Sequence, residues 1–252
     1  MLYVCIPVYN EAPTIGLLLW RIRKVFQQYS REHEILVFND GSTDATAELL
    51  KPYHTVVPLT VLGGTEHVGY AAALSALARS VSQRTRYPRR DAMITMQGDF
   101  TDPPEHLSEL IKRFEGGADV VVAERTPASL PTAARRLRRI APWILRPFPT
   151  VPGVADPFGS LRLYRIAVIR DMLREAGDGP LASATGWAAN AELLVAASRF
   201  ARRVETVELD TRFDLRQRET RVRPFNDALD LFRATRAMRT IRTMRAQPPA
   251  AS

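Results

Sequence analysis

The run LYVCIPV at residues 2–8 is continuously apolar and rich in residues that favour β-structure. A strand with this pattern is typical of a parallel sheet, in which both faces are covered by other elements. A helical pattern follows over residues 11–29, where apolar side chains recur at helical spacing. A second apolar run, EILVF, occupies residues 34–38. This strand–helix–strand order predicts the first unit of an α/β fold.

The same alternation continues along the chain. Further strands are expected at residues 56–62, 92–96, 118–123 and 203–209, and further helices at 69–82, 105–115 and 187–199. The segment SLRLYRIAVIRDML, which begins at Ser160, reads as a strand that turns into a helix. We therefore predict a Rossmann-like, mostly parallel sheet flanked by helices, with ligands bound at the carboxyl ends of the strands.

Composition limits the partners of the chain. Its 252 residues carry a net charge of +8, with arginine dominating after residue 130. A basic second half indicates an anionic partner: nucleic acid, substrate phosphates or an anionic lipid surface. No apolar segment is long enough to span a bilayer, but the basic amphipathic stretch at 133–148 is typical of an element that lies on a membrane. The lone Cys5 allows no intramolecular disulfide.

Three polar loops follow three of the expected strands. Their polar and structurally restricted residues are Pro7, Tyr9, Asn10 and Glu11; Asn39, Asp40 and Ser42; and Gln97, Gly98, Asp99 and Asp102. Each loop alone is compatible with a solvated turn whose residues were chosen for backbone geometry. In a parallel sheet, however, all three loops lie at the same edge. Their convergence favours a functional site.

Four motifs carry a resemblance to a known family. IPVYNE at 6–11, NDGSTD at 39–44 and MQGDFTDPPE at 96–105 resemble the signatures of family 2 glycosyltransferases with the GT-A fold. DPPE, with ADPFGSLRLYR at 155–165, is most similar to the polyprenyl-phosphate hexose synthases, such as the dolichyl-phosphate mannose synthases. The resemblance covers about residues 2–225.

This resemblance divides the chain into parts. It implies one GT-A domain at 1–225, with a nucleotide-sugar-binding half at 1–125 and a basic acceptor half at 126–225. A basic C-terminal helix at 226–245 and a disordered tail at 246–252 are expected to follow.

The resemblance also implies roles for individual residues. Pro7, Tyr9, Asn10, Glu11, Asn39, Asp40, Gln97 and Gly98 would bind the nucleotide sugar. Asp99, with Gln97, would bind Mg²⁺ or Mn²⁺, which neutralises the charge that develops as the diphosphate departs. The family's usual Asp-x-Asp is Gln97-Gly98-Asp99 here, so a neutral amide replaces one anionic ligand. A site with a single carboxylate should bind metal more weakly.

The implied reaction is the transfer of a hexose, mannose or glucose, with inversion, from GDP- or UDP-hexose to polyprenyl phosphate. An anionic acceptor needs positioning cations rather than a strong base. Arg125 and Arg162 match motif positions and join Asp99 as expected catalytic residues. The expected location is cytoplasmic and peripheral, on an anionic inner membrane face.

Other readings remain open. The acceptor could instead be a soluble hydroxyl compound, with Glu192 as its general base, or the chain could be a degenerate, non-catalytic nucleotide-sugar-binding protein. Nucleic acid is disfavoured, because the acidic loops would repel its phosphates in the absence of metal. The sequence also leaves open a homo-oligomer.

Overall fold

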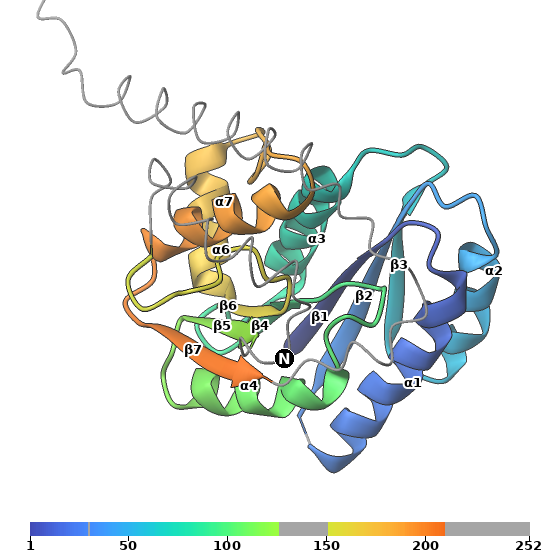
Figure 1. Ribbon diagram of the computed structural model, residues 1–252, viewed down its shortest axis with the longest axis horizontal. Helices are drawn as coiled ribbons and strands as arrows, with labels where there is room; N and C mark the ends of the chain where they lie inside the picture. Colours follow the sequence, from blue (N-terminus) through green and yellow to red (C-terminus); the bar gives the residue numbers. More distant parts are fainter. Residues whose placement is uncertain (30, 126–150, 210–252) are drawn as a thin grey trace, which may run out of the picture.

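The computed structural model describes residues 1–29, 31–125 and 151–209. In these residues, strands alternate with helices in three layers, with the sheet in the middle (Figure 1). The amphipathic stretch expected at 133–148, the helix at 226–245 and the tail at 246–252 lie outside the described residues. In the part that is described, no helix has both the length and the apolar composition needed to cross a bilayer.

The described residues form a seven-stranded sheet with the order β3-β2-β1-β4-β6-β5-β7. The strands are β1 (Leu2–Val8), β2 (His33–Asp40), β3 (Leu59–Gly64), β4 (Ala92–Thr95), β5 (Val120–Arg125), β6 (Arg162–Arg165) and β7 (Val204–Leu209). β6 runs antiparallel to β4 and β5, whereas the other pairs are parallel. The predicted mostly parallel α/β sheet is confirmed.

Helices cover both faces of this sheet. They are α1 (Ala12–Gln28), α2 (Thr46–Leu50), α3 (Tyr70–Arg84), α4 (Leu107–Glu115), α6 (Ile166–Ala176) and α7 (Gly186–Ser198), with short 3₁₀ turns η1 (Lys51–Thr55) and η2 (Pro104–His106).

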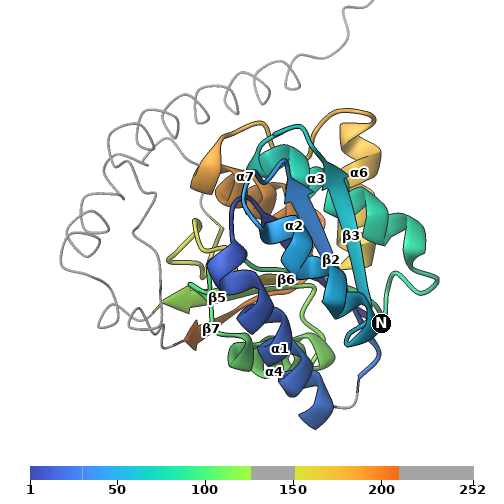
Figure 2. The same cartoon turned by 90° about the vertical axis from the view of Figure 1, so that its right-hand side faces the viewer.

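Alternate side chains of β1 enter two separate cores, as the two-residue period of a strand requires. Val4 and Ile6 pack with residues of α1 and α4, whereas Tyr3 and Cys5 pack with residues of α3, α6 and α7. Figure 2 shows α3, α6 and α7 together on one side of the sheet. Burial on both faces explains why LYVCIPV contains no polar residue.

Several boundaries differ by one or two residues from the expectation, and the start of one strand differs by three. The strand expected at 56–62 is β3, which begins at Leu59, because the chain first continues α2 as the 3₁₀ turn η1. Tyr53 in this turn donates a hydrogen bond from its hydroxyl to the carbonyl of Gly16 at 2.9 Å, so η1 is attached to α1. This contact joins segments 37 residues apart, so a local pattern could not indicate it.

Candidate active site

The three polar loops predicted to converge do lie together. They follow β2, β1 and β4, which are neighbouring parallel strands. The Thr14 hydroxyl, in the first turn of α1, donates to the Gly98 carbonyl at 2.8 Å and thereby joins the first loop to the third. A Cβ on Gly98 would lie 2.8 Å from Cγ1 of Val8. Any larger residue at position 98 would require Val8 or the third loop to move.

Asn10 connects the first loop to the second. Its side-chain Oδ1 accepts a hydrogen bond from the backbone amide of Thr43 at 2.7 Å. The backbone amide of Asn10 donates to Oγ of Ser42 at 3.0 Å. Asn10 has a φ of 54°, in the left-handed region where asparagine is tolerated better than most residues. The turn itself is closed by the Ser42 amide, which donates to Oδ1 of Asn39 at 3.1 Å. The motif residues therefore determine the shape of the two loops.

Asp40 lies at the end of β2 and is only 3% exposed. Its carboxylate accepts hydrogen bonds from the backbone amides of Val68, at 2.6 Å, and Gly69, at 3.1 Å. His67 Nδ1 lies 3.0 Å from Oδ2 of the same carboxylate. Asp40 thus holds the segment that leads into α3. A direct contact of Asp40 with a nucleobase or ribose remains a prediction.

The ring of Tyr9, in the first loop, contacts the ring of His67, in the segment that leads into α3. Their ring centroids are 4.4 Å apart. The approach of the two segments depends on Gly41, which has a φ of 68° and whose Cβ, if present, would lie 2.8 Å from the backbone of Glu66. The pattern did not indicate that residues 66–69 lie over the second loop.

The third loop presents oxygen atoms suited to a hard cation. Gln97 and Asp99 are half-buried, and Oδ1 of Asp99 accepts a hydrogen bond from the Thr101 amide at 2.9 Å. Phe100, which lies between Asp99 and Thr101, has a φ of 65°. Within the described residues, no group of three or more His, Cys, Asp or Glu side chains could hold a metal. One carboxylate and one amide oxygen nevertheless fit Mg²⁺ or Mn²⁺, whose remaining ligands are commonly water and substrate phosphates.

Arg162 was expected to contact phosphate, and the structure gives it a different position. Its side chain is 1% exposed in β6, and its guanidinium donates to the backbone carbonyls of Pro157 and Asn190. These bonds occupy both terminal nitrogens of the group. The geometry therefore favours a residue that positions other segments over one that binds phosphate directly.

Arg125 ends β5 and is paired with Leu209 of β7. β5 is parallel to β4, so Arg125 lies at the carboxyl edge of the sheet, where the three loops gather. Its proposed contact with phosphate remains a prediction.

Two acids near the acceptor segment have defined structural contacts. Glu124, 8% exposed, accepts from the amide of Asp156 at 3.2 Å and from that of Ala155, so it fixes the segment before β6. Glu124 was not anticipated, although an acid at the end of a buried strand, VVVAE, is a usable signal. Glu192 accepts from the amides of Ser183 and Ala184 at 2.8 and 2.9 Å. These contacts explain Glu192 without a general-base role.

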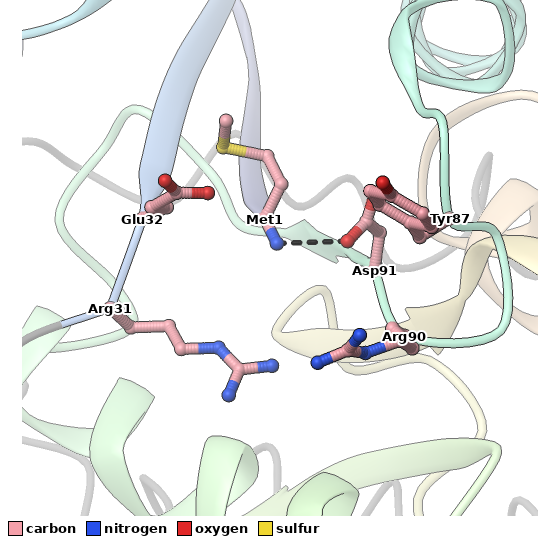
Figure 3. Close-up of a pocket in the computed structure, with 6 residues that line it drawn as sticks. All are labelled: Met1, Arg31, Glu32, Tyr87, Arg90 and Asp91. Carbon is pink, nitrogen blue, oxygen red and sulfur yellow. Dashed lines mark hydrogen bonds and ion pairs between the residues drawn. The ribbon is translucent and has the colours of Figure 1, made fainter.

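A separate cavity of about 340 Å³ lies at the opposite edge of the sheet. Three of its lining residues, Met1, Glu32 and Asp91, directly precede β1, β2 and β4 (Figure 3). The amino group of Met1 pairs with Asp91 at 2.8 Å there. The cavity is therefore at the amino ends of the strands, away from the three loops.

Comparison with known proteins agrees with this architecture. A mannosyl-3-phosphoglycerate synthase from Rubrobacter xylanophilus superimposes with a TM-score of 0.67 at 17% identity, covering 100% of this chain and 78% of that one. A glucosyl-3-phosphoglycerate synthase from Mycobacterium tuberculosis, in complex with Mn²⁺, UDP and glucosyl-3-phosphoglycerate, gives 0.64 at 17% identity, with coverages of 96% and 79%. At these identities the likeness shows the fold alone, which is of the GT-A type.

The family follows from the sequence itself. The family model described as glycosyl transferase family 2 matches residues 3–173, and the chain belongs to this family.

Curated relatives match about two thirds of the chain. The prophage bactoprenol glucosyl transferase homolog of Escherichia coli (strain K12) is 31% identical over 170 residues, which are 66% of this chain and 53% of that protein. An undecaprenyl-phosphate 4-deoxy-4-formamido-L-arabinose transferase of Photorhabdus laumondii is 28% identical over 176 residues, with coverages of 68% and 51%. The chain spans about half the length of these relatives.

Proposed function

We propose that the chain transfers a hexose, mannose or glucose, from GDP- or UDP-hexose to a polyprenyl phosphate. The observation that carries this proposal is the convergence of three family 2 loops at one sheet edge, with Gln97 and Asp99 in the third of these loops. A lipid acceptor is supported by the names of the relatives, which are bactoprenol and undecaprenyl-phosphate transferases.

In this proposal, the first two loops bind the nucleoside and the third faces the diphosphate. Asn10, Asn39 and Asp40 hold the loops in shape through hydrogen bonds to backbone amides. Asp99 and Gln97 hold Mg²⁺ or Mn²⁺, which supplies positive charge to the departing diphosphate. Preorganised loops of this kind lower the barrier, because little rearrangement is needed as charge develops.

The acceptor phosphate acts as the nucleophile. One of its oxygens forms a bond to the anomeric carbon while the bond from that carbon to the diphosphate oxygen breaks, and the electron pair leaves with the nucleoside diphosphate. An in-line displacement inverts the anomeric centre. The phosphate is already anionic, so no residue must remove a proton, in agreement with the engagement of Glu192 by backbone amides. Arg125 is proposed to position the acceptor phosphate.

A peripheral position on the cytoplasmic face of an anionic membrane completes the proposal. It is supported by the basic amphipathic sequence at 133–148, which combines arginines with a set of apolar residues. Sedimentation with anionic and with neutral liposomes tests it. Binding to anionic vesicles that is lost at high salt is the expected result, and failure to bind either vesicle would favour a soluble acceptor.

The activity is tested with purified protein, Mg²⁺ or Mn²⁺, a panel of GDP- and UDP-hexoses and a short polyprenyl phosphate. We expect one donor to give a lipid-linked hexose, and we expect Asp99→Asn to lower the rate at least about a hundredfold. Asp178→Asn, an exposed acid after α6, is the matched control and should leave the rate unchanged. Donor hydrolysis without lipid product would favour a hydroxyl acceptor. No turnover with any donor would contradict the proposal and favour a non-catalytic binding protein.

A further inference from the structure

Arg162 is a buried cation whose two terminal nitrogens are hydrogen-bonded to backbone carbonyls, whereas its Nε is buried without a hydrogen-bond partner. The guanidinium donates to the carbonyls of Pro157 and Asn190, and one nitrogen lies 3.4 Å from the Tyr164 hydroxyl. None of the ion pairs found among the described residues includes Arg162. Burial of a charge is costly unless it is hydrogen-bonded, so the guanidinium strongly favours the arrangement in which both carbonyls face it. Arg162 thereby connects the segment before β6 to α7.

The segment from Pro157 to Ser160 is also attached to the third loop. The Ser160 hydroxyl donates to Oδ2 of Asp102 at 2.5 Å, and the Thr95 hydroxyl donates to the Ser160 carbonyl at 2.7 Å. All three residues are buried. Asp102 lies three residues after Asp99. The position of this segment is therefore coupled to the loop that carries the proposed metal ligands.

Asn190 joins this segment to the nucleotide side of the site. Its Nδ2 donates to the Phe158 carbonyl at 3.1 Å, and its Oδ1 accepts from the Tyr70 hydroxyl at 2.9 Å. Tyr70 is the first residue of α3 and follows Gly69, whose amide is bound by Asp40. Burial raises the pKa of Tyr70, which keeps its hydroxyl protonated as a donor. A continuous polar path thus runs from Asp40 through Tyr70 and Asn190 to Phe158.

We propose that Tyr70, Asn190 and Arg162 are positioning residues that hold the segment Pro157–Ser160 in register with both the second and the third loop. A rigidly held segment fixes the acceptor relative to the donor, and small displacements at such a site lower the rate of transfer. The proposal rests on the proposed function only in assigning this segment to the acceptor. The mechanical connection itself is independent of that assignment.

Tyr70→Phe removes one hydroxyl without changing the size of the ring. We expect backbone amides in peptides covering 155–161 to exchange hydrogen with solvent about tenfold faster, as the loss of one hydrogen bond would allow. In the transfer assay, the KM for polyprenyl phosphate should rise several-fold while the KM for the donor stays near that of the wild type.

Tyr53→Phe is the matched control, because its hydroxyl makes a bond of the same length to Gly16 but lies outside the path. It should change neither the exchange at 155–161 nor the KM for the acceptor. Equal exchange rates and equal KM values in the two variants would overturn the positioning proposal. If the wild type showed no transferase activity, the proposed function would be contradicted, and the exchange measurement would still decide the positioning role.

Arg162→Lys separates geometry from charge. Lysine keeps the positive charge but lacks the planar fork that reaches two carbonyls. We expect Arg162→Lys to reproduce the faster hydrogen exchange at 155–161. Wild-type exchange and a wild-type KM for the acceptor in this variant would show that only the charge matters, and would contradict the positioning role.

Discussion

The hydroxyl of Thr14 donates to the Gly98 carbonyl at 2.8 Å, across 84 residues of sequence. This bond attaches the first turn of α1 to the loop that carries Gln97 and Asp99. Thr14 is buried, so its partner would face no water if the hydroxyl were removed. The bond therefore helps to hold the third loop against α1.

Thr14→Val should lower the free energy of unfolding by about 1–3 kcal/mol, because it leaves the Gly98 carbonyl unsatisfied. Urea denaturation measures this change. Thr55→Val is the control, since the exposed Thr55 hydroxyl donates to the Pro52 carbonyl at 3.0 Å and water can replace it. Equal losses of unfolding free energy in the two variants would contradict the role given to the bond between Thr14 and Gly98.

Gly63→Ala tests the packing behind the second loop. Gly63 has a φ of 92°, and its added Cβ would lie 2.1 Å from the Asn39 carbonyl oxygen. Relief requires movement of β2 or β3, so we expect unfolding free energy to fall by at least about 2 kcal/mol. Gly64→Ala, where no atom lies within 4 Å, should cost less than about 0.5 kcal/mol. Thermal or urea unfolding of both variants gives the comparison, and similar stabilities would contradict it.

Gln97→Asp should strengthen metal binding. It restores a second carboxylate to the third loop, and an added negative charge near a divalent cation is favourable. We expect the Kd for Mn²⁺, measured by electron paramagnetic resonance with UDP or GDP present, to fall about tenfold, ~1.4 kcal/mol. Gln27→Asp, on the exposed side of α1, supplies the same charge away from the site and should leave the Kd unchanged. An unchanged Kd in Gln97→Asp would indicate that residue 97 does not face the metal.

We expect the protonation of His33 to lower the free energy of unfolding in mild acid. The ring of His33 stacks on that of Phe26 with 3.9 Å between the ring centroids, and its Nε2 is buried without a hydrogen-bond partner. Desolvation by this burial lowers the pKa of His33. The unfolded chain, with an ordinary histidine pKa of about 6.5, then binds a proton more readily than the folded chain. The contribution of His33 is therefore complete above about pH 6.5 and is lost as the pH falls below it, by at most about 1.4 kcal/mol per pH unit.

The variant His33→Phe should flatten this dependence. Unfolding by urea at pH 7 and pH 5 measures it, and His54→Asn in the 3₁₀ turn η1 is the control that should keep the wild-type slope. An equal pH dependence in His33→Phe and in the wild type would refute the role of His33.

The sequence by itself determined the α/β architecture and the region of the site. The continuous apolar runs LYVCIPV and EILVF form strands because of the residues within them, and the turns depend in the same way on their own glycine and asparagine residues. Local pattern therefore predicts the strands, most helices and the convergence of the three loops. The motifs at 6–11, 39–44 and 96–105 identified the family for the same reason, because each is a continuous stretch.

Only the tertiary structure decided what the buried polar groups contact. Asp40 binds amides 28 and 29 residues away, and Ser160 binds Asp102 across 58 residues. Arg162, expected at phosphate, instead holds the carbonyls of Pro157 and Asn190. A charged side chain in a motif has the same sequence signature whether it faces a ligand or a carbonyl, and the partner depends on which distant segments the sheet brings beside it.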